Sequence, residues 1–397
     1  MRSFSQLGVK ELRYVELDEA LRRLEAGVKP LNVVEEAAVE EAAGRVLASE
    51  VEAPHDLPRL DVAHFDGYAV RSVDASSPSK LLKLAERSVV KRGEACFVAT
   101  GQPLPEGADA VVELESVELV NGGVLVHRVA KPWLNVTRRG SDLKAGAIVA
   151  ERGRRLGPRD VKALLALGVS RVRVYARPKV LVAPTGDEFV EDPSKDTHTP
   201  FARKVLEAGG AVVEAGHPIS DSVEEAVDAL AQGLESFDAV FTIGGASIGP
   251  RDVMWEAALR LGAAPLFRGV KVVPGRVTSC AILGGKPIVL LPGHVQSLLV
   301  GLCFIALPAL RALSTGSATP LRPLGVVELA SVPEFKGFEG FKRVVFVKLM
   351  APGLAEALAG DSSMIGPIAL SDGFVVLEPG RRSRSACFYR PFEVYGP

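Results

Sequence analysis

Three short turns in the middle of the chain combine glycine with acidic or hydroxyl side chains. They are Pro184-Thr185-Gly186-Asp187-Glu188, Gly244-Gly245-Ala246-Ser247-Ile248-Gly249 and Leu291-Pro292-Gly293-His294. Glycine lets a backbone approach a ligand closely, and amides at the start of a helix favour an anion. The turns therefore predict a site for a phosphate-bearing ligand, to which the Ser247 hydroxyl adds a donor. Taken singly, each glycine is equally explained by a tight turn between a strand and a helix.

Acidic residues gather at the same turns. Asp187 and Glu188 follow one apolar run, Asp252 closes the next loop, and Asp221 precedes a predicted helix. Carboxylates repel a phosphate unless a cation bridges them, which predicts Mg²⁺ as the mediator. Asp221 fits a simple helix start equally well.

Two basic residues, Lys271 and Arg276, flank Pro274-Gly275 farther along the chain. Near a bound phosphate they would offset its negative charge. The same sequence is also compatible with a solvated basic turn.

A second group of turns lies earlier in the chain. Residues 61–71 read Asp-Val-Ala-His-Phe-Asp-Gly-Tyr-Ala-Val-Arg, and residues 100–110 are dense in turn formers. Asp66-Gly67 is first a hairpin signal. Asp61 has no evident capping role, so it is the residue of this stretch that invites a chemical role. His64 fits a structural histidine better than a metal ligand.

Residues 177–317 must position the first group of turns. Apolar strands are predicted at 180–183, 211–213, 238–243 and 287–291, and they alternate with helices. Ser222-Val223-Glu224-Glu225 has the form of a capping box, and Thr199 is predicted to cap the preceding helix. Such alternation predicts a parallel sheet covered on both faces, with ligands bound beyond the carboxyl ends of its strands.

The rest of the chain predicts three further domains, so the fold class is α/β multidomain. Residues 1–60 and 138–176 are expected to form a discontinuous helical linker domain, with helices near 17–27, 34–48 and 158–167. Residues 61–137 predict a β-rich domain, and residues 318–397 a β barrel or sandwich.

Composition excludes several classes of protein. The formal net charge of −1 argues against generic nucleic-acid binding. The four cysteines show no metal-ligand spacing, which indicates a reducing compartment. The longest apolar run, residues 298–310, suits a buried helix or a subunit contact and is too short to span a membrane. Without an apolar N-terminal signal core, the chain is expected to be cytoplasmic, and its scarcity of Asn and Gln is typical of a thermophile.

The order of these phrases resembles the MoeA family of molybdopterin molybdenumtransferases. Residues 43–48 resemble the stretch before the family's first signature, and residues 61–71 its Asp-x-x-x-x-Asp-Gly-Tyr-Ala-Val phrase. Residues 100–111 are similar to its Thr-Gly-Ala…Pro-x-Gly-Ala-Asp-Ala-Val phrase. Residues 185–188, the Gly-Gly-x-Ser-x-Gly-x-x-Asp run ending at Asp252, and Pro274-Gly275-Arg276 complete six ordered motifs across nearly the whole chain.

The resemblance implies four domains, the third similar to the molybdopterin-binding MogA and MoaB proteins, and an elongated homodimer. It implies that adenylylated molybdopterin and molybdate or tungstate are substrates, that Mg²⁺ is a cofactor, and that AMP leaves as the metal joins the dithiolene. A MogA/MoaB-like adenylyltransferase is the implied partner. By position it implies catalytic roles for Asp61, Thr100, Glu188 and Asp252, metal ligands at Glu188, Asp221, Asp252 and Asp142, and substrate contacts at Gly186, Asp187, Gly244, Gly245, Ser247, Gly249, Lys271, Arg276, Pro292, Gly293 and Ser363.

The sequence departs from the family pattern mainly at three histidines. His64 ends the usual Asp-Asn/Arg-Ser-Ala phrase, His198 stands for an asparagine, and His294 replaces the asparagine of Pro-Gly-Asn-Pro-Val-Ser. In the Lys-Pro-Gly-Lys phrase the first lysine is Val273, and Lys271 on the same face of a strand can restore its charge. Two alternatives to the transferase stay open: a non-catalytic molybdopterin carrier or scaffold, and an unrelated nucleotide-binding α/β protein. The transferase hypothesis requires the sheet-edge loops to meet the β-rich domain of either subunit.

Overall fold

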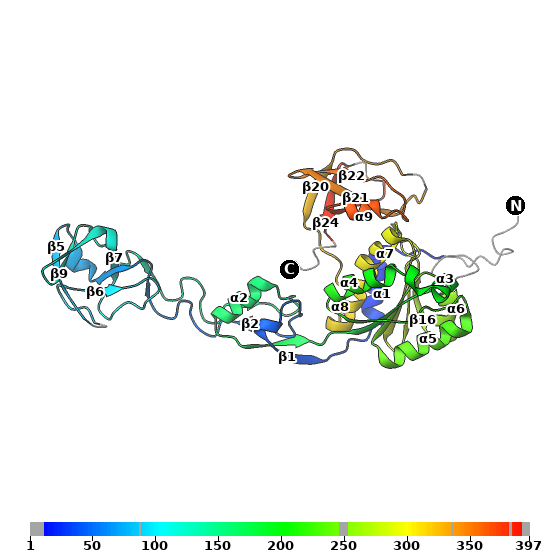
Figure 1. Cartoon of the computed structure of the whole chain (residues 1–397), viewed down its shortest axis with the longest axis horizontal. Coiled ribbons are helices and arrows are strands. Elements are labelled where there is room, and N and C mark those ends of the chain that lie inside the picture. Colours follow the sequence, from blue (N-terminus) through cyan, green and yellow to red (C-terminus); the bar gives the residue numbers. More distant parts are fainter. Residues whose placement is uncertain (1–11, 87–88, 246–252, 336, 381–382, 391–397) are drawn as a thin grey trace.

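The structure, a computed structural model, describes residues 12–86, 89–245, 253–335, 337–380 and 383–390. Figure 1 shows an elongated chain. An α/β unit and a barrel lie together at one end, a small linker lies in the middle, and a β-rich module lies at the other end.

The α/β unit is built on a six-stranded sheet in the order β14-β13-β15-β19-β18-β16. Four strands are parallel, as predicted: β13 (Lys179–Pro184), β14 (Val212–Ala215), β15 (Ala239–Ile243) and β19 (Lys286–Leu291). The other two, β16 (Ala264–Arg268) and β18 (Ser279–Leu283), form an antiparallel edge. Only Gly284 and Gly285 join β18 to β19, and a two-residue connection permits only an antiparallel pair.

Helices cover both faces of this sheet. One face carries α1 (Leu17–Gly27), α4 (His198–Ala208) and a continuous helix made of α7 (Val295–Gly301), η6 (Leu302–Ala306) and α8 (Leu307–Thr315). The other carries α5 (Val223–Ser236) and α6 (Val253–Arg260). Phe241 faces the first layer and Val240 the second, because successive strand residues point to opposite faces. The short helix α3 (Asp187–Glu191) and the 3₁₀ turn η5 (Pro193–Lys195) follow β13.

The helix from Val295 to Thr315 is the apolar centre of this unit. It is 21 residues long and apolar enough to cross a membrane, but 83% of its most apolar window is buried inside the protein. It is therefore a core helix, as the apolar run at 298–310 predicted.

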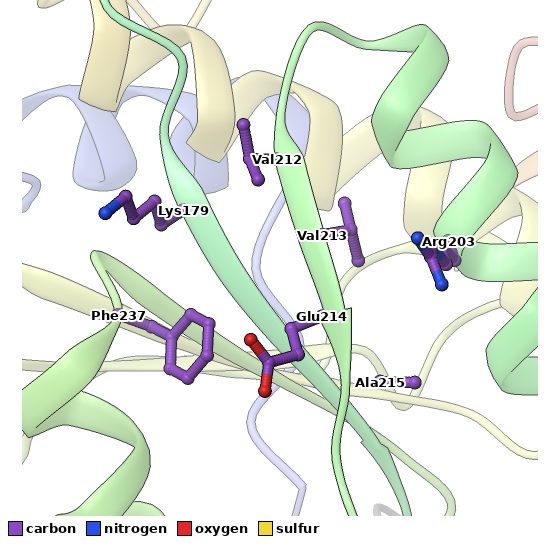
Figure 2. A pocket seen from close by; sticks show the side chains of 7 residues that line it. All are labelled: Lys179, Arg203, Val212, Val213, Glu214, Ala215 and Phe237. Atoms are coloured by element: carbon purple, nitrogen blue, oxygen red, sulfur yellow. The ribbon is translucent and has the colours of Figure 1, made fainter.

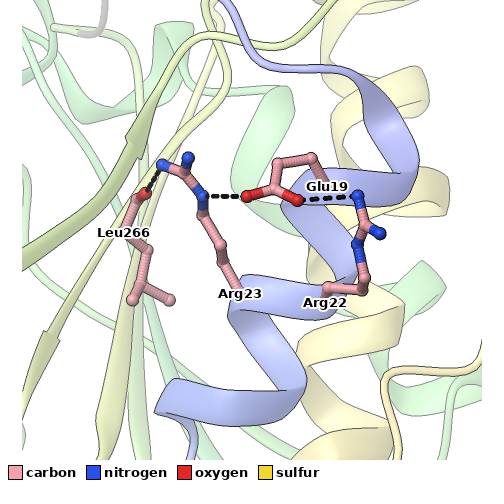
Figure 3. Close-up of polar contacts among 4 residues, drawn as sticks. All are labelled: Glu19, Arg22, Arg23 and Leu266. Carbon is pink, nitrogen blue, oxygen red and sulfur yellow. Dashed lines mark hydrogen bonds and ion pairs between the residues drawn. The ribbon is translucent and has the colours of Figure 1, made fainter.

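Helix α1 packs on the α/β unit rather than on the linker in which residues 1–60 were placed. Leu17, Leu21 and Leu24 are buried against α8 and β16. The Arg23 guanidinium donates to the carbonyl of Leu266 on β16, and Glu19 joins Arg22 to Arg23 (Figure 3). An amphipathic pattern shows that a helix has a buried face, but it does not show which distant surface covers that face.

The linker is made mainly of strands, so the helix predicted at 34–48 is wrong. Strand β1 (Val34–Ala38) pairs antiparallel with β12 (Arg171–Tyr175), and β2 (Val51–Glu52) pairs with β11 (Ile148–Ala150). The Glu and Ala residues of β1 favour a helix, but its partner strand is rich in Val and Tyr, and tertiary pairing overrides a weak local preference. The 3₁₀ turn η2 (Val39–Glu41) follows β1, and α2 (Pro158–Ala166) lies where a helix was predicted.

The β-rich module contains a second six-stranded sheet, in the order β7-β4-β6-β5-β9-β8. Its strands are β4 (Gly67–Val70), β5 (Lys80–Leu84), β6 (Glu94–Val98), β7 (Ala110–Glu113), β8 (Val117–Val120) and β9 (Gly123–Val126), with short turns η3 (Ser72–Ala75) and η4 (Leu114–Ser116). A separate pair, β3 (Val62–Ala63) and β10 (Val136–Thr137), connects it to the linker. At Gly67 a Cβ atom would lie 2.1 Å from the Val112 carbonyl oxygen, so β4 and β7 approach closely only because residue 67 is glycine.

The C-terminal part is a closed five-stranded barrel, as predicted. Its strands are β20 (Gly325–Leu329), β21 (Lys342–Ala351), β22 (Leu354–Ala357), β23 (Gly373–Leu377) and β24 (Ser385–Tyr389). They close in the ring β21-β22-β20-β24-β23-β21, and β17 (Val272–Val273) extends the sheet beside β21. The short helix α9 (Gly366–Leu370) lies between β22 and β23.

Candidate functional site

The three glycine turns lie side by side at the carboxyl edge of the α/β sheet. The Thr185 amide donates to the Ile243 carbonyl at 2.8 Å, and the Gly244 amide donates to the Leu291 carbonyl at 3.0 Å. Gly244 has φ +96°, and a Cβ there would lie 2.8 Å from the Thr185 carbonyl oxygen. The backbones of the first two turns therefore touch only because residue 244 is glycine.

Acidic side chains lie at this edge, as the sequence predicted. Asp187 accepts a hydrogen bond from the Asp221 amide at 2.9 Å, which brings these two residues together. The Glu188 carboxylate folds back over Gly186, so that a Cβ at Gly186 would lie 2.6 Å from its Oε2. Both Asp187 and Glu188 are exposed to solvent.

Exposed carboxylate oxygens are ligands of the type that Mg²⁺ prefers, and Mg²⁺ commonly keeps several waters beside one or two carboxylates. Asp187 and Glu188 fit that requirement. Within the described ranges, no three His, Cys, Asp or Glu side chains are gathered as a metal centre. Ser247, Gly249 and Asp252 lie outside the described residues.

A loop of the barrel is fastened to the third turn. His294, the N-cap residue of α7, has its Nδ1 2.8 Å from the Ser362 hydroxyl. Gln296 donates from its side chain to the carbonyls of Asp361 and Met364, at 2.6 and 2.9 Å. These bonds place Ser363 beside the Pro292-Gly293 turn, although almost seventy residues separate them in sequence.

Within that loop, Ser363 donates from both its amide and its hydroxyl to one carboxylate oxygen of Asp361. These two bonds, assisted by nearby His294, hold the pKa of Asp361 below its usual range. The loop therefore carries a negative charge with satisfied hydrogen bonds.

His198 approaches the same turn from the start of α4. The Gly293 backbone favours the charged form of its ring. Burial lowers the pKa of His198 below its usual value, because desolvation outweighs the opposing effect of nearby Asp196. Asp196, rather than Thr199, caps α4: its Oδ1 accepts from the amides of His198 and Thr199, each at 2.9 Å.

The two basic residues assigned to this site are engaged in other contacts. Lys271 forms an ion pair of 2.6 Å with Glu16. Arg276 donates to the Tyr14 hydroxyl, and its guanidinium lies 4.7 Å from the centre of the Phe338 ring. In this structure both side chains hold the segment before α1 and the barrel against the α/β unit.

The two phrases of the β-rich module also come together. The Leu104 amide donates to the Asp61 carbonyl at 2.9 Å, while the Asp61 carboxylate accepts from the Arg139 amide at 2.7 Å. Thr100 donates from its amide and hydroxyl to Asp66 Oδ1, at 2.6 and 2.8 Å. In the sequence, Asp66 is predicted only as a turn residue, and no motif marks Arg139. The Asp-Gly pair marks the turn, but it does not reveal what the carboxylate accepts.

These bonds lower the pKa of Asp66 from its ordinary value, because they favour the ionised carboxylate. Asp66 thus fixes the position of the Thr100 hydroxyl. Asp61 and Thr100 are held in one surface region.

The two groups of residues do not meet within one chain. Thr100 closely follows β6, which Figure 1 places at the opposite end of the molecule from α3, where Glu188 lies. Asp142 is bonded through its amide to the Leu57 carbonyl at 3.0 Å, so it lies on the linker side and not with Glu188. Of the two arrangements that the sequence left open, convergence within one subunit is therefore excluded, and convergence between two subunits stays a prediction. The linker is a thin set of two-stranded pairs, which carries the β-rich module outward instead of folding it back (Figure 1).

A hollow of about 580 Å³ lies elsewhere on the α/β unit (Figure 2). It is lined by Lys179, Arg203, Val212, Val213, Glu214, Ala215 and Phe237. Lys179 begins β13 and Phe237 directly precedes β15, so the hollow lies toward the amino ends of the strands. It is separate from the carboxyl edge and contains none of the residues assigned to the site.

The fold defines a multidomain α/β protein whose candidate ligand site lies at the carboxyl edge of its main sheet. Residues 15–168 match the family described as MoeA N-terminal region, domains I and II, and residues 181–312 match the family described as "probable molybdopterin binding domain". The chain is 31% identical over 280 residues to a molybdopterin biosynthesis protein of Methanocaldococcus jannaschii, covering 66% of this chain and 70% of that protein.

The similarity also extends over almost the entire length. The chain is 26% identical over 406 residues to the molybdopterin molybdenumtransferase of Staphylococcus epidermidis, covering 96% of this chain and 95% of the relative. The crystal structure of the MoeA protein of Pyrococcus horikoshii superposes with a TM-score of 0.74 at 28% identity, covering 95% of this chain and 99% of that one. The chain belongs to the MoeA family.

Proposed function

We propose that this protein is a molybdopterin molybdenumtransferase, which inserts molybdate or tungstate into adenylylated molybdopterin and releases AMP. The observation that carries the proposal is similarity along the whole chain, because the relative with that activity matches 96% of it. The joined glycine turns at the carboxyl edge supply a place for the phosphate groups. A non-catalytic carrier is not favoured, since the β-rich module with Asp61 and Thr100 is retained in full.

The chemistry proposed for this site rests on position and charge. Gly244 and Gly293 let the phosphates approach the backbone, and Ser363 would donate its hydroxyl to the substrate in exchange for its bond to Asp361. Mg²⁺, held by Glu188 and Asp252, would neutralise the pyrophosphate and the departing AMP. Holding the oxyanion and the phosphoanhydride in one orientation would supply most of the rate gain.

Asp61 and Thr100 are proposed to reach the site from a second subunit. Within one chain they lie at the opposite end from Glu188, so a homodimer is needed to bring the two groups together (Figure 1). The surface beside Asp61 is suited to a partner, because Leu60 and Phe65 are 55% and 48% exposed there. A MogA/MoaB-like adenylyltransferase as the source of the substrate and a cytoplasmic location belong to the same proposal.

The proposal is tested by incubating the protein with adenylylated molybdopterin, Mg²⁺ and either oxyanion, and measuring released AMP. Release that depends on Mg²⁺ and on molybdate or tungstate is expected. Tight molybdopterin binding without turnover, unchanged by Asp61→Ala, would instead identify a carrier.

The dimeric site has its own test. Asp61→Ala and Glu188→Ala subunits should each be inactive alone. In a mixed dimer one of the two sites is free of both substitutions, so random mixing should restore about a quarter of wild-type activity. No restoration, with mixed dimers demonstrated by mass spectrometry, would exclude a site shared between subunits.

A further inference from the structure

The segment just before α1 lies along the loop that carries the two predicted substrate cations. The Val15 amide donates to the Gly269 carbonyl at 3.2 Å, and the Lys271 amide donates to the Val15 carbonyl at 2.8 Å. A Cβ at Gly269 would lie 2.9 Å from the Tyr14 ring. The segment and the loop are therefore held together by backbone hydrogen bonds and by side-chain contact.

This loop lies at the carboxyl edge of the α/β sheet. Strand β16 is antiparallel to β18, and β18 is antiparallel to β19, so β16 runs in the same direction as the parallel strands. Residues 269–278, which join β16 to β18, therefore lie at the edge of the glycine turns. A Cβ at Gly275 would lie 3.0 Å from Val300 and 3.3 Å from the Ser297 carbonyl oxygen, so the loop packs on α7, which follows the Pro292-Gly293 turn.

The segment places a carboxylate on one of the two cations. Lys271 Nζ lies 2.6 Å from Glu16 Oε1, and the two side chains are 35% and 56% exposed. An ion pair so open to solvent is weak, so an arriving anion can displace the carboxylate. Arg276 donates to the neutral Tyr14 hydroxyl, a contact that does not cancel its charge. Glu16 is therefore the residue that competes with an anion at this loop.

We propose that Glu16 is an internal competitor, whose carboxylate occupies on Lys271 the place of an oxyanion group of the substrate and leaves when that group binds. The inference rests on the proposed function, because the group is the phosphate or the metal oxyanion of that reaction. No covalent bond changes, since one anion replaces another on the ammonium group. The exchange favours doubly charged groups over singly charged ones, because Coulomb attraction grows with charge.

The test is calorimetric titration of the full-length protein with sodium tungstate and, separately, with inorganic pyrophosphate. Glu16→Gln should bind at least one of them about two- to fivefold more tightly than wild type, because the anion no longer has to break an exposed ion pair. Glutamine has nearly the shape of glutamate without its charge. A gain with tungstate assigns Lys271 to the metal oxyanion, and a gain with pyrophosphate assigns it to the phosphates. Damage to the fold would lower affinity and cannot imitate a gain.

Glu19→Gln is the matched control, because it removes the same charge from α1, where Glu19 pairs with Arg22 and Arg23 (Figure 3). It should bind both anions as wild type does. Lys271→Met should bind more weakly, and adding Glu16→Gln to it should give no gain. The inference is overturned by equal affinities of Glu16→Gln and wild type for both anions, by an equal gain in Glu19→Gln, by a gain that persists without Lys271, or by no binding of either anion.

The AMP assay separates this inference from the proposed function. In that assay Glu16→Gln should lower KM for adenylylated molybdopterin and leave kcat nearly unchanged, since it removes a competitor of binding. If wild type releases AMP and Glu16→Gln changes neither KM nor anion affinity, the competitor is refuted while the transferase stands. If wild type releases no AMP but Glu16→Gln gains anion affinity through Lys271, the transferase is refuted while the competitor stands.

Discussion

Replacing Gly244 with alanine tests whether contact between the first two turns positions the site. The backbone there has φ +96°, and leaving the ordinary conformations costs an L-residue about 1–2 kcal/mol. The new Cβ would also lie 2.8 Å from the Thr185 carbonyl oxygen and 2.9 Å from its hydroxyl. Carbon–oxygen contacts are normally about 3.3 Å or longer, so the two turns must separate by about 0.5 Å.

Gly262→Ala is the matched control, because Gly262 has φ +89° with no atom within 4 Å of the added Cβ. Backbone strain should cost both variants about 1–2 kcal/mol of stability, seen as a fall of a few degrees in Tm, and the contact with Thr185 should make the loss larger in Gly244→Ala. Only Gly244→Ala should also lose activity, by about tenfold or more in kcat/KM for AMP release, since displacements of this order misalign bound reactants. Equal activities of the two variants would refute a positioning role for the contact between Gly244 and Thr185.

Further predictions concern three other parts of the molecule. Asp66→Asn removes the charge that accepts both Thr100 bonds, so AMP release should fall about tenfold, and the Tm at neutral pH should fall slightly because the stabilising carboxylate is lost. Wild-type activity would contradict a role for Thr100. These bonds lower the pKa of Asp66 from its ordinary 3.8, so they stabilise the folded protein above that pH. The stabilisation is lost as the pH falls toward the pKa of the folded state. If Asp66→Asn and wild type unfold in acid at the same pH, the bonds to Thr100 do not stabilise the fold. Leu206→Ala opens a cavity at a fully buried site and should lower the free energy of unfolding, measured with denaturant, by about 2–5 kcal/mol. A much smaller loss would indicate that Leu206 is loosely packed. Burial raises the pKa of Cys303 to about 12, which keeps its thiol unreactive in the folded protein. A thiol reagent should therefore label exposed Cys387 in the native protein and Cys303 only after unfolding. Mass spectrometry of digests measures the labelling of each residue.

Local signals predicted the main elements of the α/β unit. The Ser222 side chain accepts from the Glu225 amide at 3.4 Å at the start of α5, as the capping box indicates. The cap predicted at Thr199 is wrong, because the Asp196 carboxylate accepts from the amides of His198 and Thr199 at the start of α4. The error at 34–48 has a different source: the segment becomes a strand only by pairing with β12, which lies more than a hundred residues away.

The structure confirms that the three glycine turns lie at one edge of the sheet, while the roles of their residues stay predictions. The turns after β13, β15 and β19 had to meet, since parallel strands end at one edge. Sequence similarity placed Ser363 at the same site, but its attachment through Gln296 depends on how the barrel packs. Lys271 and Arg276 were predicted to contact the substrate, but they bind Glu16 and Tyr14 instead. The sequence could not show these contacts, because the partners lie some 255 residues earlier in the chain.

The amino-acid order by itself determined most strands, helices and turns of the α/β unit, and which family the chain resembles, because periodicity, capping and turn chemistry act over a few residues. Only the tertiary structure decided which charged side chains are free to bind a ligand and which are paired within the protein. It also decided how far the residues of the β-rich module lie from those at the edge of the α/β sheet. Those properties depend on packing between distant segments and on the reach of a thin linker, which holds Thr100 and Glu188 at opposite ends of one chain (Figure 1).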